Sequence, residues 1–583
     1  MPNENSGAVG GRSGQDKRGG LVTPSWWHAS SLFPAEEWVA GWTDDRPEWT
    51  LDDVGAWDER LLMYMEDIDY SIRCRQRGWT LWYAPDSVVR HHYHGSASEA
   101  LCDYLCNRNR FLLLAKHFPL KLPGSIASSH FLMQKQFDWL YRSLLAAVRI
   151  LCEEHETETA LTVLEQLRTV LTDQFGTVAA RKFFSHIEVV LGLRPIRVGI
   201  YDHAGHFPGG GQRYVAEMAA VMQDRYEVTY LFNNEVSLDQ YREWFGLDLS
   251  RCASKIVPLS FFIERGSSMP DEGITVRERH NVFDPVSRES LDYDIFINSN
   301  MLTMVNPLSP VSLFVCHFPD RKRTRFFQVN QYTHLLINGR YTGEWVRKRW
   351  QLEPSMMIHP PVQMDHPDSS ADSKERIILS VSRFEISGSK KQLEMVQAFD
   401  QLCRRWPEAT RGWTLVLAGG SVADNPYLDR VTEAAERAEA EIELRPNLTV
   451  EAIRDLYRRS AIFWHACGLK ERRPERVEHF GMTTVEAMQN YCVPVVIDGG
   501  GQREIVEQGR DGFRFRTLGQ LQRHTLELIE DDGLRCRLAQ QAFARGQDFN
   551  REVFRAQLDE LLAGLELELM GADSLENAAS ALQ

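Results

Sequence analysis

The chain has 583 residues, of which 43% are hydrophobic and 25% are charged, a profile typical of globular proteins made of several domains. Its formal net charge is −15. General nucleic-acid binding needs a basic surface that replaces the counterions of the phosphates, so the charge argues against a nucleic-acid partner.

The cysteines and the lack of long apolar segments indicate a cytoplasmic protein. Ten cysteines are spread from Cys74 to Cys536 with no C-x-x-C pair, as expected for reduced thiols in the cytosol. The first twenty residues are mostly Gly, Ser, Asn and charged residues, without the apolar core of a signal peptide. No window reaches the roughly 18 apolar residues of a membrane span.

The amino-terminal third predicts a tail, a Trp-rich segment and a helical connector. Residues 1–20 predict a flexible tail, and residues 21–120 end in strand-like and helix-like pieces. Residues 121–194 carry apolar residues at three- and four-residue spacing, which indicates helices. Within them, HFLMQKQFDWLYRSLLAAVR mixes aromatic residues and Leu with Lys and Arg. Packing on a neighbouring domain explains this stretch, and peripheral contact with the inner face of a membrane stays open as an alternative.

From residue 195 onward, strands and helices alternate in two successive sets. The first, residues 195–360, runs from IRVGIYD through YEVTYLFN, DYDIFINS, VSLFVCHF and HLLING. The second, residues 361–565, runs from RIILSVSRF through TLVLAGG, AIFWHA and VPVVIDGG, and residues 566–583 form a tail. Two such sets predict an α/β protein with two Rossmann-like parallel sheets. A ligand is expected where the carboxyl ends of the two sheets face each other.

The start of one helix in the second set has the features of a diphosphate site. Phe480 and Gly481 lead into a helix that is expected to begin near Thr483 or Thr484, both good N-caps. The free amide groups of a helix start, here including Met482, attract anions. We expect Phe480, Gly481, Met482 and Thr483 to bind the donor.

Two glutamates flank this helix start and carry a family resemblance. Glu478 precedes the helix, Glu486 lies within it, and E-A-M, P-V-V, G-G and E-I-V follow in order. This pattern resembles the retaining family-4 glycosyltransferases of the GT-B fold. The resemblance implies that Glu478 contacts the donor sugar and Glu486 the ribose hydroxyls. It covers residues 195–565 and implies transfer from a nucleotide-sugar donor to a glycan or lipid-linked acceptor, with no metal or other cofactor required.

Two further segments resemble the same family. SVSRFEISGSKKQLEMVQAF is similar to its strand–arginine–loop–lysine–helix element, so Arg383 and Lys390 are expected to neutralise the leaving diphosphate, with Lys391 as an alternative to Lys390. In HFPGGGQRY, Gly210 and Gly211 would let the backbone approach the donor.

Two histidines at predicted strand ends complete the candidate site. His317 in CHFPD resembles a histidine that family members place near the reacting sugar, although a purely structural histidine would also explain it. His465 in AIFWHACG is expected to line the pocket. The predicted catalytic residues are Glu478, His317, Arg383 and Lys390.

The segment of residues 58–96 resembles the acceptor half of an inverting family-2 glycosyltransferase of the GT-A fold. The resemblance implies that Asp67 is a general base and His91 a metal ligand. Its acidic cluster comprises Glu66, Asp67 and Asp69. Only 57 residues precede Asp58, too few for the donor half. We therefore expect an inactive remnant that binds an acceptor, a second copy of the chain or a partner transferase. A gene start placed too late is the other explanation.

Two other functions stay open. A GT-B module can act without catalysis, as a scaffold or regulator of another transferase, but the charged residues of the candidate pocket are all present, which favours an enzyme. A sugar-nucleotide epimerase can share the two-lobed fold, but it would need a different set of acid–base residues.

Overall fold

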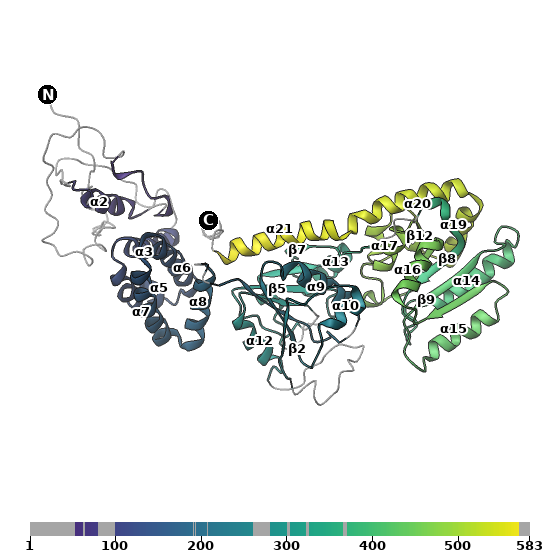
Figure 1. The fold of residues 1–583 in the computed structure, drawn as a ribbon, viewed down its shortest axis with the longest axis horizontal. Helices are drawn as coiled ribbons and strands as arrows, with labels where there is room; N and C mark the ends of the chain where they lie inside the picture. Colours follow the sequence, from purple (N-terminus) through teal and green to yellow (C-terminus); the bar gives the residue numbers. More distant parts are fainter. Residues whose placement is uncertain are drawn as a thin grey trace, which may run out of the picture. The chain divides into compact units, whose positions relative to one another are not determined.

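The computed structural model describes residues 53–61, 64–79, 99–190, 192, 194–206, 208–259, 280–299, 303–321, 326–364 and 370–570. The chain divides into two compact units, Met1–Arg194 with Glu566–Gln583, and Pro195–Leu565 (Figure 1).

In the described part of the smaller unit, all regular secondary structure is helical. Its helices are η3 (Glu59–Leu61), α2 (Glu66–Gln76), α3 (Glu99–His117), η4 (Pro119–Lys121), α4 (Leu122–Ala127), α5 (His130–Met133), α6 (Phe137–Glu154), α7 (Thr157–Phe175) and α8 (Thr177–Val190). The described part of the predicted GT-A-like segment contains helices and no strand, and its expected strand-like piece lies outside the described residues.

The stretch with the mixed aromatic and basic residues packs into the core of this unit. Phe131, Leu144 and Leu151 are at most 2% exposed and join one apolar cluster with residues of α3 and α7. The apolar side of α6 is therefore covered by protein.

The first half of the larger unit is a seven-stranded sheet in the order β3-β2-β1-β4-β5-β6-β7, with every neighbouring pair parallel. The strands are β1 (Arg197–Tyr201), β2 (Glu227–Phe232), β3 (Ala253–Ile256), β4 (Ile295–Asn298), β5 (Val311–Cys316), β6 (His334–Ile337) and β7 (Met356–Met357). The helices are α9 (Gly210–Met222), α10 (Asp239–Phe245), α12 (Asp284–Glu289), η5 (Ser290–Asp292), η6 (Val329–Gln331) and α13 (Arg340–Trp350).

The second half repeats the plan with a six-stranded parallel sheet in the order β10-β9-β8-β11-β12-β13. The strands are β8 (Glu375–Val381), β9 (Thr414–Gly419), β10 (Ile442–Pro446), β11 (Ser460–His465), β12 (Val493–Ile497) and β13 (Phe513–Phe515). The helices are η7 (Ala371–Ser373), α14 (Gln392–Arg405), α15 (Pro426–Glu436), α16 (Val450–Arg459), η8 (Pro474–Arg476), α17 (Met482–Met488), α18 (Gln502–Ile505), α19 (Leu518–Glu530), α20 (Asp532–Gly546), η9 (Gln547–Phe549) and α21 (Arg551–Leu569).

The central strands explain why the sequence forms these sheets. All residues of β5, β11 and β12 are buried, as expected for parallel strands covered by helices on both faces. The prediction of an α/β protein with two Rossmann-like parallel sheets is confirmed.

The last helix joins the two halves. After α20, α21 runs back along the first half of the larger unit (Figure 1). There Arg551 binds Glu217 of α9 through three hydrogen bonds of 2.9 to 3.1 Å, and the ring of Phe554 lies 5.7 Å from that of Tyr214.

Candidate active site

Each sheet has a point at which the strand order reverses, between β1 and β4 in the first sheet and between β8 and β11 in the second. Chain segments leave such neighbouring strands in opposite directions, which opens a crevice at their carboxyl ends. His465 is the last residue of β11, and Lys390 lies in the loop between β8 and α14. Two predicted site residues therefore lie at the switch point of the second sheet.

Glu478 lies at the centre of the cluster that these residues form. Its Oε2 atom accepts a hydrogen bond from Lys390 Nζ at 2.8 Å and lies 3.2 Å from His465 Nε2. Its Oε1 atom receives no hydrogen bond from any residue that the structure describes. The side chain of Glu478 is 21% exposed and that of His465 is 3% exposed. One carboxylate oxygen is therefore held by protein while the other stays open.

The neighbours of Glu478 keep its carboxylate ionised. Burial raises the pKa of Glu478, but the charge of Lys390 and the contact with His465 outweigh this effect and hold the pKa well below its usual range. Burial likewise opposes the charge of Lys390, whose pKa Glu478 nevertheless raises above its ordinary value. The two groups form an enclosed ion pair at neutral pH.

The glycine loop after β12 fixes the backbone of Glu478. The amide of Gly501 donates to the carbonyl of Glu478 at 2.9 Å. A Cβ atom at Gly500 would lie 2.1 Å from the same carbonyl oxygen, and Gly500 has φ +58°, a conformation that favours glycine. The glycines are therefore needed for the close approach of this loop.

Helix α17 begins earlier than the sequence predicts. Its N-cap is Gly481, with φ 117° and no side-chain cap, so the prediction of a threonine cap is wrong. A Cβ atom at Gly481 would lie 2.4 Å from Nε2 of the buried Gln502, which is why only glycine fits. Phe480 is 3% exposed and packs in an apolar cluster with Val485 and Phe549.

Gly210 and Gly211, the first two residues of α9, lie close to other predicted site residues. A Cβ atom at Gly210 would lie 3.5 Å from Sδ of Met482, and one at Gly211 would lie 3.1 Å from Nε2 of His317. That nitrogen is buried and has no hydrogen-bond partner among the described residues. Burial lowers the pKa of His317 to about 4, so the ring is neutral at pH 7. The structure thus brings Gly210, Gly211, His317 and Met482 together.

The side chains of Arg383 and Lys391 contact residues other than Glu478. The side chain of Arg383 is 74% exposed and bonds Glu385 at 3.1 Å, without contacting Glu478. Lys391 lies 3.9 Å from Glu394. Of the two adjacent lysines, Lys390 is the one that contacts Glu478.

The sequence reasoning missed the partners of Glu486. Oε1 of Glu486 accepts a hydrogen bond from Arg213 Nη1 at 3.1 Å, and Oε2 accepts one from Tyr457 Oη at 2.9 Å. Arg213 comes two residues after Gly211, so its position close to the predicted glycine loop could have been read from the sequence. Tyr457 belongs to α16, whose sequence carries no such signal.

Two further contacts cross between the halves of this unit. The ring of His479 stacks on Phe318 at 4.2 Å with an interplanar angle of 7°. The carboxylate of Glu504 accepts the amide of Arg340, at the start of α13, at 2.9 and 3.2 Å. Residues adjacent to Glu478 and His317 thus hold the two halves together.

The acidic cluster of the smaller unit has a different setting. Asp69 is fully buried and lies within 2.8 Å of Arg73, Lys116 and His117. Asp67 is exposed in the first turn of α2, beside Glu66. His91 lies outside the described residues. Of the three acidic residues, Asp69 is therefore held in ion pairs, whereas Glu66 and Asp67 are less constrained.

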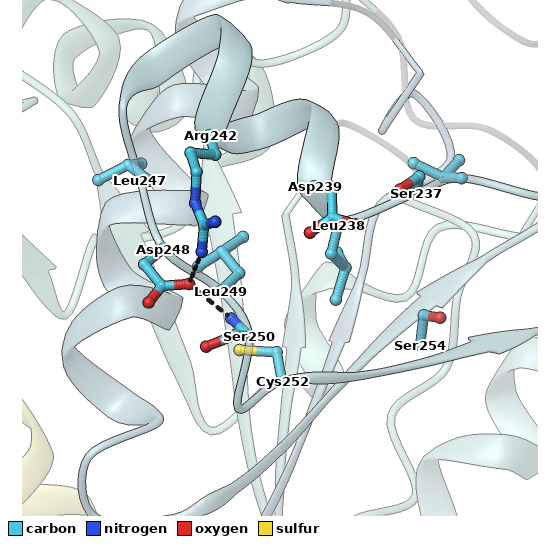
Figure 2. A pocket seen from close by; sticks show the side chains of 11 residues that line it. Ser237, Leu238, Asp239, Arg242, Leu247, Asp248, Leu249, Ser250, Cys252 and Ser254 are labelled. Atoms are coloured by element: carbon cyan, nitrogen blue, oxygen red, sulfur yellow. Dashed lines mark hydrogen bonds and ion pairs between the residues drawn. The ribbon is translucent and has the colours of Figure 1, made fainter.

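Two pockets lie apart from Glu478. Figure 2 shows one of about 270 Å³ between α10 and β3, where Arg242 pairs with Asp248 at 2.6 Å. The other, of about 500 Å³, is lined by Arg340, Glu504 and neighbouring residues. Neither contains a predicted site residue.

Among the residues that the structure describes, no group of three or more His, Cys, Asp or Glu side chains could hold a metal ion. None of the helices in the described part of the chain is both long and apolar enough to cross a membrane.

Part of the chain is similar to a known protein family and to individual known proteins. The model of the family "Glycosyl transferases group 1" matches residues 362–545. Alpha-1,3/1,6-mannosyltransferase ALG2 of Mus musculus is 27% identical over 243 residues, which cover 34% of this chain. The N-acetylglucosaminyl-diphospho-decaprenol L-rhamnosyltransferase of Mycobacterium tuberculosis is 34% identical over 90 residues, 14% of this chain and 29% of that protein.

The chain spans about half of the mannosyltransferase, 55% of its length. Among solved structures, Anabaena Alr3699/HepE in complex with UDP-glucose is 16% identical, with a TM-score of 0.47, and the match covers 63% of this chain and 100% of that one. The second half of the larger unit carries a glycosyltransferase domain of group 1 at residues 362–545.

Proposed function

We propose that the unit Pro195–Leu565 transfers a sugar from a nucleotide-sugar donor to a glycan or lipid-linked acceptor, with retention of configuration, in the synthesis of a surface polysaccharide or glycoconjugate. The observation that carries the proposal is the environment of Glu478. Its Oε2 atom is held by Lys390 and His465, while Oε1 stays open in the crevice of a glycosyltransferase domain. An ionised carboxylate with one free oxygen is a strong acceptor for a sugar hydroxyl.

The other residues take roles around this anchor. Lys390 supplies positive charge for the leaving diphosphate, which the backbone near Gly481 and Met482 approaches. Arg383 would have to move from Glu385 to assist. Glu486 accepts the ribose hydroxyls. Neutral His317 offers Nε2 to the reacting sugar, whose own leaving phosphate assists deprotonation of the acceptor.

The smaller unit has a supporting role in this proposal. Its segment 58–96 is an acceptor-binding or interaction remnant of a family-2 transferase, through which a second copy or a partner transferase would bind. The ion pairs of Asp69 support an inactive remnant, because they hold one of its acidic residues in the core. The proposed location is cytoplasmic. Any contact with the inner face of a membrane would use residues other than the covered side of α6.

The test is the release of nucleoside diphosphate from a panel of UDP- and GDP-sugars, with acceptor present. We expect turnover with one donor, abolition by Glu478→Ala and no change with Asp67→Asn. The cognate nucleotide at about 100 times its Kd should also stabilise the protein by roughly 2.7 kcal/mol in thermal unfolding.

The results separate the alternatives. Equal turnover by wild type and Glu478→Ala would remove the role of Glu478. Nucleotide binding without turnover would favour the non-catalytic scaffold. Loss of a second, metal-dependent product in Asp67→Asn would contradict the remnant assignment.

A further inference from the structure

Glu486 is held by residues from both halves of the larger unit. Arg213 reaches it from α9 of the first half, and Tyr457 reaches it from α16 of the second. Each residue takes a different carboxylate oxygen. The side chains of Arg213 and Glu486 are only 18% and 15% exposed, so this ion pair is enclosed, unlike the exposed pairs that contribute little.

A second carboxylate lies near Arg213 without a hydrogen bond to its Nε atom. That atom lies 4.0 Å from Oε1 of Glu217, whose side chain is 6% exposed. Glu217 receives three hydrogen bonds from Arg551 of α21. The guanidinium group therefore lies between two carboxylates, of which Glu217 is itself bound to the last described helix of the unit.

We propose that Arg213 is a positioning residue of the donor site, which holds Glu486 in the orientation that binds the ribose. The proposal rests on the function proposed above. An ionised carboxylate has about four lone-pair sites, so ribose hydroxyls can bind while Arg213 and Tyr457 stay in place. Because Arg213 and Glu486 belong to different halves, the contact exists only while the halves lie as they do here. Ribose recognition is thereby linked to the arrangement of the two halves.

The experiment compares ribose and dideoxyribose nucleotides. Isothermal titration calorimetry would give the Kd of UDP and GDP and of their 2′,3′-dideoxy counterparts, for wild type, Arg213→Met and Arg213→Lys. We expect the wild type to prefer the ribonucleotide by roughly tenfold or more, because charge-assisted hydrogen bonds are lost with the hydroxyls. Arg213→Met should lose most of this preference while its affinity for the dideoxynucleotide stays unchanged.

Two controls separate positioning from a general effect. Arg347, another arginine of the first half, pairs with Glu353 at 2.7 Å and is 52% exposed, so Arg347→Met should keep the full preference. In a Glu486→Gln background, Arg213→Met should have no further effect on the preference, because the residue acts through Glu486. Thermal unfolding of each variant verifies that it is folded. Arg213→Lys keeps the positive charge and is therefore the milder substitution.

The outcomes are distinct. An unchanged ribose preference in Arg213→Met, or an equal loss of affinity for both nucleotides, would overturn the positioning role while nucleotide binding stands. If the wild type binds none of the four nucleotides, the proposed function itself fails, and the inference fails with it.

Discussion

Lys390 Nζ lies 2.8 Å from Glu478 Oε2, although 88 positions separate the two residues in the chain. Lys390 comes from the loop after β8 and Glu478 from the segment after β11, the two strands at which the order of the second sheet reverses. The topology of the sheet thus creates an enclosed ion pair that neither local segment contains.

The adjacent lysines give a matched pair of variants. Lys390→Met should lower kcat/KM for the donor by about 100-fold or more, because it removes a positive charge from the site of the leaving diphosphate. Lys391→Met should change kcat/KM little, because that lysine lies beside Glu394. Steady-state release of nucleoside diphosphate measures both. A larger loss in Lys391→Met would reverse the assignment.

Two glycines allow a test of backbone approach. Gly500→Ala places a Cβ atom 2.1 Å from the carbonyl oxygen of Glu478 at φ +58° and should cost about 1–3 kcal/mol of stability. It should also reduce turnover, since Glu478 must shift. Gly564 lies in α21 with open space around it, so Gly564→Ala should stabilise the protein by about 0.5–1 kcal/mol. Urea unfolding compares the two, and equal effects would contradict the crowding at Gly500.

The stability of the protein should fall in mildly acidic solution, in part because of His317. Burial lowers the pKa of this residue to about 4 from an ordinary value of 6.5. Between these values the unfolded chain binds a proton that the folded protein does not. The free energy of unfolding therefore decreases as the pH falls from about 6.5 to about 4, and this contribution is fully present above that window.

His317→Asn should remove part of that decrease, on the order of 2–3 kcal/mol, at 1.36 kcal/mol for each pKa unit. Unfolding in urea at pH 7.5, 5.5 and 4.5 measures it. The pKa values of His203 and His479 are lowered in the same direction, so the wild-type curve retains their contribution and only the difference reports on His317. Parallel curves for the two proteins would show that His317 accepts a proton in the folded state.

The ion pair between α21 and α9 should stabilise the protein, because the Glu217 side chain is only 6% exposed, although that of Arg551 is 38% exposed. Arg551→Met leaves Glu217 enclosed without its main partner and should cost about 1–3 kcal/mol. In the double variant Arg551→Met/Glu217→Met most of this loss should return, because no unpaired charge remains. Additive losses in the double-mutant cycle would show that the two residues do not interact in solution.

The sequence was sufficient to predict the central strands but not the edges of the sheets. β5, β11 and β12 are continuous apolar runs because both faces are covered. β3 is exposed along its whole length and β7 has two residues, so neither leaves an apolar pattern. Edge strands are formed by hydrogen bonds to a neighbouring strand, which local composition does not encode.

The candidate site was predictable where residue type and motif coincide. Glu478, Lys390 and His465 lie together as the motif order suggested, although their catalytic roles stay predictions. The predicted start of α17 was wrong, because the side chain of Gln502, which is distant in sequence, requires glycine at the N-cap. Arg213 was missed because its partner lies 273 residues away.

The return of α21 to α9 has a consequence for synthesis of the protein. Glu217 and its partner Arg551 are separated by 334 positions. At about 5–20 residues per second, the ribosome needs roughly 15–70 seconds to travel between them. Throughout that time the nascent first half carries an unpaired carboxylate where the helix will later dock. The docking of α21 is therefore expected to come late in synthesis, and the emerging chain offers this face to chaperones before α21 covers it.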